Sequence, residues 1–198
     1  MILHFEGLDL AGKSTVCRLL KDALPNSWRI RRNTLLESNP VESLADKLRK
    51  EEEDPVCVGW LYHAALRYDL AHFRESGDSI VQDSTILLRS LAYHSAFGNA
   101  ELVECFLNLL EDHPRFDRSF VLVPDRETRL HRLRIRRKQN LGPEDFLVVQ
   151  NPEVFQKMEE ILVEYSCEFF RATVVDTSGS IDMAWIDNFI RNHLRDIV

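Results

Sequence analysis

The sequence has few of the features that mark secreted, metal-scaffolded or membrane-embedded proteins. Its four cysteines, Cys17, Cys57, Cys105 and Cys167, stand too far apart to form a short metal-binding or redox pair. No apolar run approaches the roughly 18 residues that cross a bilayer, and no basic and apolar leader follows Met1. We therefore expect reduced thiols, no membrane partner and a cytoplasmic location.

Basic residues are fewer than acidic residues. Lysine and arginine total 25 against 32 aspartates and glutamates, which gives a net charge of −7. An acidic protein does not attract nucleic acid or an anionic membrane through its overall charge, so nucleic acid is not an expected partner and any phosphate site has to be local. The length of 198 residues and the 44% apolar content suit a single folded domain over residues 1–198.

Short apolar segments alternate with helical patterns along the chain. Strands that alternate with helices use crossover connections, which produce a mostly parallel sheet with helices on both faces. The sequence therefore predicts an α/β, doubly wound fold with five strands. These strands are expected at residues 2–5, 28–32, 79–82, 119–123 and 172–175. Helical stripes fall at residues 16–23, 44–48, 61–72, 88–95, 102–110, 154–169 and 186–197, with a further helix starting near Thr128.

Residues 7–14, GLDLAGKS, match the pattern G-x-x-x-x-G-K-[ST] between a predicted strand and a predicted helix. Glycines permit a tight loop whose N–H groups, with the positive end of the helix, surround phosphate oxygens. We expect Lys13 to reach the β- and γ-phosphates of ATP and Ser14 to bind Mg²⁺. A plain strand-to-helix turn is the alternative, but a lysine at a helix N-terminus is unfavourable without an anion. The expected ATP-binding residues are Gly7, Leu8, Asp9, Leu10, Ala11, Gly12, Lys13, Ser14 and Thr15.

Two further features suit phosphoryl transfer. Asp83 ends the third expected strand, where a carboxylate either holds Mg²⁺ or caps the next helix. Seven basic residues lie between Arg126 and Lys138, and on a helix Arg129, Arg132 and Arg136 would share one face and repel one another. We expect at least one of these arginines to stabilise a transferred phosphoryl group, whereas the alternative is a solvated basic face.

Residues 5–15, FEGLDLAGKST, resemble the P-loop of thymidylate kinases, for which the usual pattern is F-E-G-x-D-G-x-G-K-S/T-T. The resemblance implies a kinase that moves the γ-phosphoryl group of Mg-ATP to a small, nucleoside-like acceptor, and it implies a homodimer. Weaker matches follow in the family's order at residues 62–67, at residue 83 with residues 90–93, at residues 125–136 and at residues 176–178.

The resemblance also implies roles for individual residues. Asp9 would contact a sugar hydroxyl of the acceptor, Arg67 would contact its phosphate, and a phosphate-covering lid would lie at about residues 132–146. If the acceptor is a hydroxyl, Asp9 or Asp83 would act as general base. The expected catalytic residues are Lys13, Asp9, Asp83, Arg132 and Arg136; the expected acceptor-binding residues are Asp9, Arg67 and Asp83; the expected metal ligands are Ser14 and Asp83.

The sequence departs from the family's pattern mainly on the acceptor side. Leu10 stands where the family has glycine or arginine, Ser84 replaces an arginine, and Leu66 replaces an acidic residue. Two alternatives therefore stay open: a catalytically degenerate nucleotide-binding regulator or scaffold, and a P-loop kinase for a non-nucleotide small molecule. A regulatory GTPase is disfavoured because the sequence contains no N-K-x-D motif.

The homodimer prediction has a second basis in the pattern of one helix. Tyr62, Leu66 and Tyr68 in the 61–72 helix cannot all face one core strip. An apolar side chain left outside the core would suit a subunit interface.

Overall fold

A parallel five-stranded sheet forms the centre of the protein. The computed structural model describes residues 1–25, 27–75, 77–136, 143–195 and 197. The strands are β1 (Ile2–Glu6), β2 (Trp28–Arg32), β3 (Ser79–Asp83), β4 (Arg118–Val123) and β5 (Thr173–Asp176). Their order is β2-β3-β1-β4-β5, and every neighbouring pair is parallel. The predicted α/β, doubly wound fold is confirmed, and the observed strand ends lie within one residue of the expected ones.

Side-chain caps mark the start of several helices. Asn39 accepts hydrogen bonds from the N–H groups of Val41 and Glu42, and Asp54, Asp125 and Asp182 cap other helices in the same way. The helices are α1 (Lys13–Ala23), α2 (Pro40–Lys50), α3 (Pro55–His72), α4 (Ile86–Ala96), α5 (Ala100–Leu107), α6 (Arg126–Ile135), α7 (Leu147–Gln150), α8 (Pro152–Phe170) and α9 (Met183–His193), with a short 3-10 helix at Pro143–Phe146.

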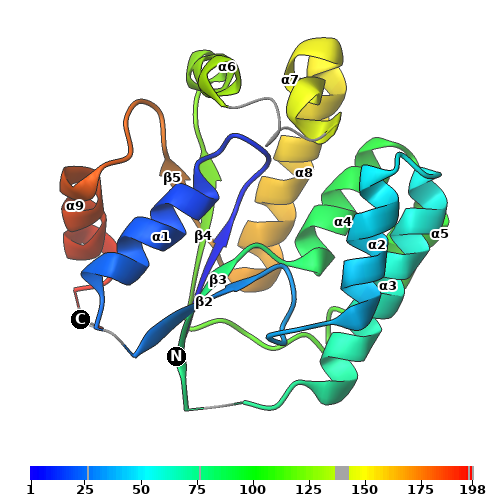
Figure 1. Cartoon of the computed structure of the whole chain (residues 1–198), viewed down its shortest axis with the longest axis horizontal. Coiled ribbons are helices and arrows are strands. Elements are labelled where there is room, and N and C mark those ends of the chain that lie inside the picture. Colours follow the sequence, from blue (N-terminus) through cyan, green and yellow to red (C-terminus); the bar gives the residue numbers. More distant parts are fainter. Residues whose placement is uncertain (26, 76, 137–142, 196, 198) are drawn as a thin grey trace.

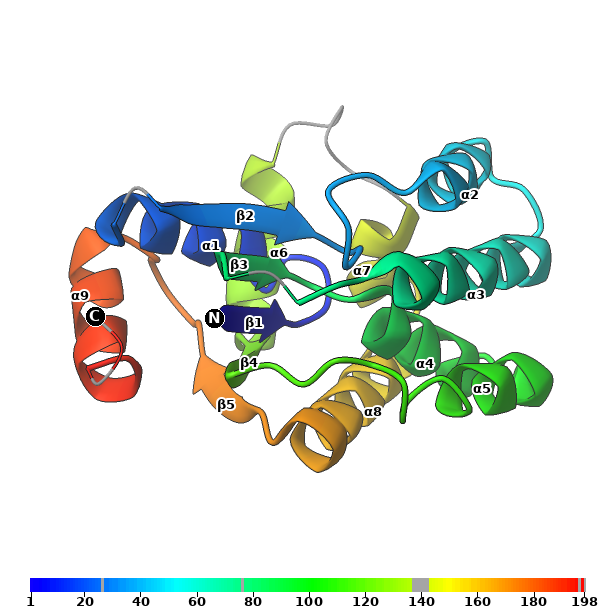
Figure 2. The same cartoon turned by 90° about the horizontal axis from the view of Figure 1, so that it is seen from below.

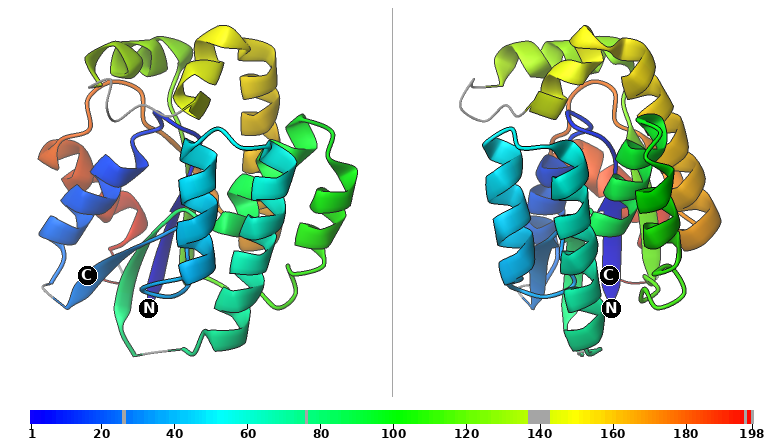
Figure 3. Two further views of the ribbon diagram at one scale, coloured as in Figure 1. Left: turned by 45° about the vertical axis from the view of Figure 1, so that its right-hand side comes forward. Right: turned by 90° about the vertical axis from the view of Figure 1, so that its right-hand side faces the viewer.

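Helices cover both faces of the sheet, as Figure 1 and Figure 2 show. On one face α1 packs against α9, and on the other face α4 packs against α3, α5 and α8. On that second face α2 lies alongside α3 (Figure 3). None of the helices in the described part of the chain is long and apolar enough to cross a membrane.

Each face has its own hydrophobic core. Leu3 and Phe5 of β1 pack with α1 and α9, and Leu91 of α4 packs with Phe106 and Leu162 on the opposite side. These side chains are fully buried, and each contributes about 1.5–3 kcal/mol through removal from water. The polar residues of β1, His4 and Glu6, alternate with the apolar ones along the strand and are buried as well.

The strand order places a functional site at one edge of the sheet. After β1 the chain forms β2 and β3 on one side, and it then crosses over to form β4 and β5 on the other. In open parallel sheets, ligands bind outside the carboxyl ends of the strands where the order reverses in this way. The loops that follow β1, β3, β4 and β5 therefore meet at a single edge.

Some expected helix limits are corrected. The fifth helical stripe ends at Leu107 and the last helix ends at His193, although Leu194 still belongs to the core. The prediction that Arg129, Arg132 and Arg136 share one helix face is wrong. Helix α6 ends at Ile135, and Arg136 has extended backbone with φ −68° and ψ 134°.

Candidate active site

The loop between β1 and α1 has the backbone that the glycine pattern predicts. Gly7 and Gly12 have φ values of 150° and 92°. A Cβ atom on Gly7 would lie 2.7 Å from the carbonyl oxygen of Leu122, so a larger residue does not fit there. Leu10 also adopts a left-handed φ of 65°, a conformation that favours glycine. This explains why glycine suits that position in the resembled pattern, and it means that Leu10 is held under local strain.

Lys13 folds back over this loop. Its Nζ atom donates hydrogen bonds to the carbonyl oxygens of Gly7, at 2.5 Å, and Leu8, at 3.2 Å. Burial lowers the pKa of Lys13, and the nearby Arg89 charge acts in the same direction. Gly12 has no side chain to cap α1, so the first N–H groups of the helix are available to an anion. The ammonium group of Lys13 and the N-terminus of α1 thus lie together, where both would attract an anion.

Ser14 and Asp83, the two expected metal ligands, are in direct contact. The Ser14 hydroxyl donates to Oδ2 of Asp83 at 2.8 Å, and the Asp83 side chain is almost fully buried. Asp83 does not cap the following helix, because Thr85 holds that position and accepts from the N–H of Leu88. A hydroxyl and a carboxylate are oxygen ligands of the kind that Mg²⁺ binds together with phosphate and water. The described residues contain no cluster of three or more His, Cys, Asp or Glu side chains that would hold a metal by themselves.

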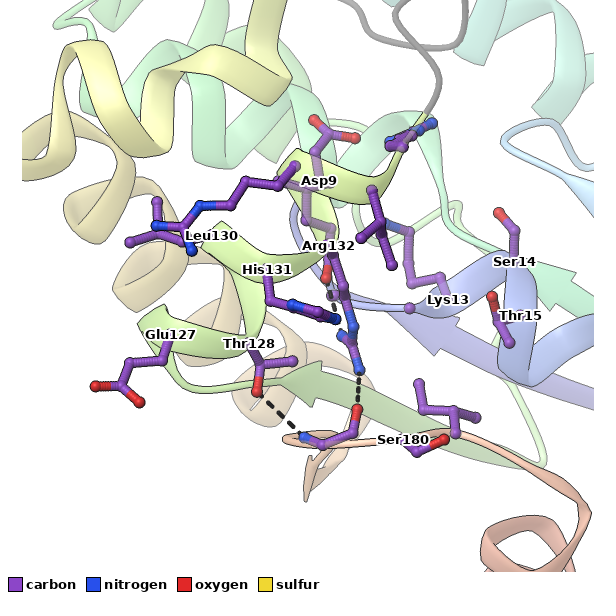
Figure 4. Close-up of a pocket in the computed structure, with 18 residues that line it drawn as sticks. Asp9, Lys13, Ser14, Thr15, Glu127, Thr128, Leu130, His131, Arg132 and Ser180 are labelled. Atoms are coloured by element: carbon purple, nitrogen blue, oxygen red, sulfur yellow. Dashed lines mark hydrogen bonds between the residues drawn. The ribbon is translucent and has the colours of Figure 1, made fainter.

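A cavity of about 1220 Å³ lies over the loop, and we call it the P-loop cavity. It is lined by residues 9–15, by α6 and by residues 179–181. Figure 4 shows Arg132 reaching from α6 between the P-loop and the loop that carries Ser180. Its guanidinium group donates to the carbonyl oxygens of Leu10 at 2.9 Å, Thr177 at 2.6 Å and Gly179 at 3.1 Å. Arg132 therefore ties the two walls of this cavity together.

A second cavity of about 510 Å³ lies between α2, α3 and α4, and we call it the helical cavity. Of the described residues, Asp9 alone lines both cavities. Its Oδ2 atom forms an ion pair with Arg89 of α4 at 3.0 Å. Burial acts to raise the pKa of Asp9, but the charges of Arg89 and Lys13 outweigh it and lower that pKa to about 2. Asp9 is therefore ionised at neutral pH at the junction of the two cavities.

Sequence reasoning missed the role of two arginines. From the sequence, Arg89 has no assigned role. Its position as the single charged residue within the apolar helix ILLRSLAYHSA is a signal that could have indicated a functional residue. Arg129 was named without an assigned role. It is 2% exposed and forms an ion pair with Glu159 of α8. It also donates to the main-chain carbonyl oxygen of Asp9 at 2.7 Å and lies 5.0 Å from the centre of the Phe155 ring.

The model of the thymidylate kinase family matches residues 5–185. The chain belongs to the thymidylate kinase family. A probable thymidylate kinase from Sulfolobus acidocaldarius is 25% identical over 184 residues, which cover 91% of this chain and 90% of that protein. As a member of this family, the protein is a P-loop kinase, which is an ATP-dependent phosphotransferase that acts on a nucleotide or nucleoside.

Solved structures agree with this fold. The thymidylate kinase of Candida albicans has a TM-score of 0.69 at 19% identity and covers 99% of this chain and 90% of its own. The deoxyadenosine kinase of M. mycoides with bound dATP has a TM-score of 0.66 at 17% identity, with 98% and 100% covered. The thymidylate kinase of Ehrlichia chaffeensis has a TM-score of 0.66 at 15% identity, with 98% of each chain covered.

In this thymidylate kinase family member, Arg67 does not line the cavity in which the resemblance implies contact with an acceptor phosphate. Arg67 is exposed on α3 and lines neither cavity, whereas Tyr62 of the same helix lines the helical cavity. Five residues separate the two, which turns Arg67 about 140° around the helix from Tyr62. The side chain of Arg67 is thus directed away from the expected acceptor.

The expected lid falls partly outside the described residues, because residues 137–142 are not among them. Arg136 and Asp145, on either side of that interval, form an ion pair at 2.7 Å. Arg136 also lines the P-loop cavity. The lid therefore stays a prediction, and its two described ends are in contact.

Proposed function

We propose that the protein transfers the γ-phosphoryl group of Mg-ATP, bound in the P-loop cavity, to a nucleoside-like acceptor bound in the helical cavity. The observation that carries this proposal is the position of Asp9, which lines both cavities. Phosphoryl transfer needs the acceptor oxygen in line with the γ-phosphorus, so two substrates in these cavities meet beside Asp9.

The donor side rests on Lys13 and the N-terminus of α1. Once ATP binds, Lys13 leaves the carbonyl oxygens of Gly7 and Leu8 for the β- and γ-phosphates, which compensate its buried charge. Ser14 and Asp83, whose side chains are in contact, would hold Mg²⁺. The metal, when bound, neutralises charge on the transferring group. Residues 7–15 supply the remaining contacts to ATP.

The lid side rests on Arg132 and Arg136. Both line the P-loop cavity and both now pair with oxygen atoms of the protein. We propose that closure of a lid at about residues 132–146, within a single domain, turns at least one of these guanidinium groups to the transferring phosphoryl group. Such a cation stabilises the charge of the transition state.

The proposal is tested by ADP release from Mg-ATP in the presence of nucleosides, nucleoside monophosphates and non-nucleotide hydroxyl compounds. We expect release that depends on an acceptor from one of the first two classes. No ADP release with any of these compounds, in protein that still binds ATP, indicates a nucleotide-binding scaffold. Release with a non-nucleotide compound alone indicates a kinase of another substrate class.

Two further properties belong to the same proposal. The protein acts in the cytoplasm, where its four free cysteines stay reduced. It acts as a homodimer, although Leu66 is buried in the core of its own chain and Tyr62 lines the helical cavity. The half-buried Tyr68, which lines neither cavity, and the resemblance to dimeric kinases then remain as support for the dimer. A molecular mass by light scattering that stays monomeric over a wide concentration range would contradict it.

A further inference from the structure

The helical cavity has more acidic than basic side chains among the described residues that line it. The acidic ones are Asp9, Asp46, Glu52 and Glu53, and the basic ones are Arg49 and Arg89. His94 also lines the cavity, but burial lowers its pKa to about 4, so the ring is neutral at pH 7. The lining therefore favours an uncharged or cationic occupant over an anion.

Both arginines already face carboxylates. Arg89 forms an ion pair with Asp9 at 3.0 Å, and Arg49 lies 3.7 Å from Asp46. A phosphate group on the acceptor would have to compete for these guanidinium groups. It would also lie close to the ionised Asp9, and such a like-charge contact disfavours binding.

Two other positions that bear on an acceptor phosphate do not supply a cation to the cavity. Arg67 is exposed and lines neither cavity. Ser84, the residue after Asp83, is buried, and its hydroxyl donates to Oε1 of Glu6 at 2.7 Å. The end of β3 thus presents a neutral residue at this point.

Other parts of the lining suit a planar ring. Tyr93 of α4 and Phe97, the residue that follows this helix, have ring centroids 4.5 Å apart, and Met158 of α8 contributes an apolar wall. Asn33 and Gln150 add amide groups that donate and accept hydrogen bonds. Aromatic walls with a few neutral polar groups are typical of pockets that bind small planar ligands.

We propose that the acceptor is a nucleoside that reacts through a free hydroxyl and carries no phosphate group. This inference rests on the proposed function. The acceptor oxygen forms a bond to the γ-phosphorus while the bond from that phosphorus to the β–γ bridging oxygen breaks, and ADP leaves with those electrons. The hydroxyl proton passes to the carboxylate of Asp9 and from there to water. Asp9 is thus the general base, and Arg89 holds its Oδ2 atom in place.

The experiment compares nucleosides with their own 5′-monophosphates at saturating Mg-ATP. Each pair shares its base and sugar, and the monophosphate differs by the phosphate that esterifies the 5′-hydroxyl, which adds charge and blocks that oxygen as an acceptor. We expect kcat/KM for at least one nucleoside to exceed that for its monophosphate by about 100-fold or more, since a like-charge contact costs several kcal/mol. Phosphorus NMR of the product should show a nucleoside monophosphate, and it identifies the hydroxyl that reacted. The matching deoxy analogue, which lacks that hydroxyl, should inhibit competitively without ADP release.

A variant separates the role of Asp9 from simple packing. Asp9→Asn keeps the size of the side chain and removes its charge. We expect kcat for the best nucleoside to fall by about 100-fold or more, as for loss of a general base, with KM changed less than about threefold. Equal or better use of the monophosphates by the wild-type protein would overturn the inference while leaving the kinase proposal intact. ADP release with neither series, in protein that still binds ATP, would contradict the proposed function itself.

Discussion

Arg129 of α6 holds the backbone of Asp9 by a hydrogen bond of 2.7 Å to its carbonyl oxygen. The same guanidinium group is buried and pairs with Glu159 of α8, whereas the Asp9 side chain is 24% exposed where it lines the two cavities. One buried cation therefore connects α6 and α8 to the residue that lines both cavities. Because Arg129 contacts the backbone of Asp9 and not its carboxylate, it acts as a positioning residue.

Arg129→Met should therefore lower both stability and turnover. Removal of one partner of a buried ion pair leaves Glu159 without its partner, which costs about 3–5 kcal/mol. The free energy of unfolding, from urea denaturation, checks this value. Arg126→Ala provides the control, because Arg126 lies on the same helix and is exposed. That control should change stability by less than about 0.5 kcal/mol.

The double variant Arg129→Met with Glu159→Gln separates the charge from the positioning role. It leaves no unpaired charge, so we expect a large part of the lost stability to return. The kcat should remain low, because the carbonyl oxygen of Asp9 still lacks its donor. Recovery of kcat along with stability would show that Arg129 serves the fold alone.

Lys13→Ala should abolish phosphoryl transfer and leave the fold intact. The hydrogen bonds of the Lys13 ammonium group in the described part of the chain go to carbonyl oxygens of its own loop, and its proposed ligand is the ATP phosphates. Loss of such a charge-stabilising group costs about 10²–10³ in kcat or more. Steady-state kinetics and circular dichroism measure the two effects. Lys21→Ala, on the same helix, is the control, and wild-type activity in Lys13→Ala would contradict the P-loop assignment.

Ser14→Ala and Asp83→Asn should both raise the Mg²⁺ concentration required for half-maximal rate. The two side chains are in contact at 2.8 Å, so each variant removes one oxygen ligand from the same proposed site. The rate measured against free Mg²⁺ at fixed ATP gives this value directly. Asp22→Asn serves as control, since Asp22 is an exposed carboxylate on α1. An unchanged Mg²⁺ requirement in Asp83→Asn would remove this residue from the metal site.

The parts of the fold that were predicted correctly have local signals. The five strands are short segments of apolar or alternating residues, and the P-loop is a contiguous pattern in which Gly7, Gly12 and Lys13 have fixed spacing. Such patterns depend on neighbouring residues and on the 2.0 or 3.6 residue periods of strands and helices. They can be read without knowing which distant segments meet.

The acceptor side depends on pairings that no local pattern encodes. The Asp9–Arg89 pair joins residues 80 positions apart, and the Arg129–Glu159 pair joins two different helices. The helical spacing predicted that Arg129, Arg132 and Arg136 share one face of a helix. Helix α6 ends at Ile135, so Arg136 does not lie on that face. A periodic pattern indicates where a helix can form, but the position of its end depends on tertiary contacts.

The buried His113 should lower the stability of the protein in mild acid. His113 lies against the rings of Phe116 and Phe170, with His4 and Arg115 nearby, and burial lowers its pKa to about 4. In the unfolded chain a histidine has a pKa of about 6.5, so below that pH the unfolded state binds the proton that the folded state excludes. The stabilisation from the neutral ring is therefore complete above about pH 6.5 and is lost as the pH falls toward 4, by up to about 1.4 kcal/mol per pH unit.

His113→Gln should remove the part of this slope that His113 contributes, while His94, whose pKa burial also lowers to about 4, keeps its own part. The Gln side chain does not titrate, and its amide can replace the contact of the ring Nδ1 atom with the carbonyl oxygen of Pro114. Urea denaturation at pH 7, 6 and 5 gives the free energy of unfolding for the wild type and the variant. We expect the difference between the two to change by about 2 kcal/mol between pH 7 and pH 5, since one proton is taken up on unfolding over most of that range. His131 is exposed on α6, so His131→Gln is the control. An equal change of the free-energy difference with pH in this control would show that burial of His113 is not the cause.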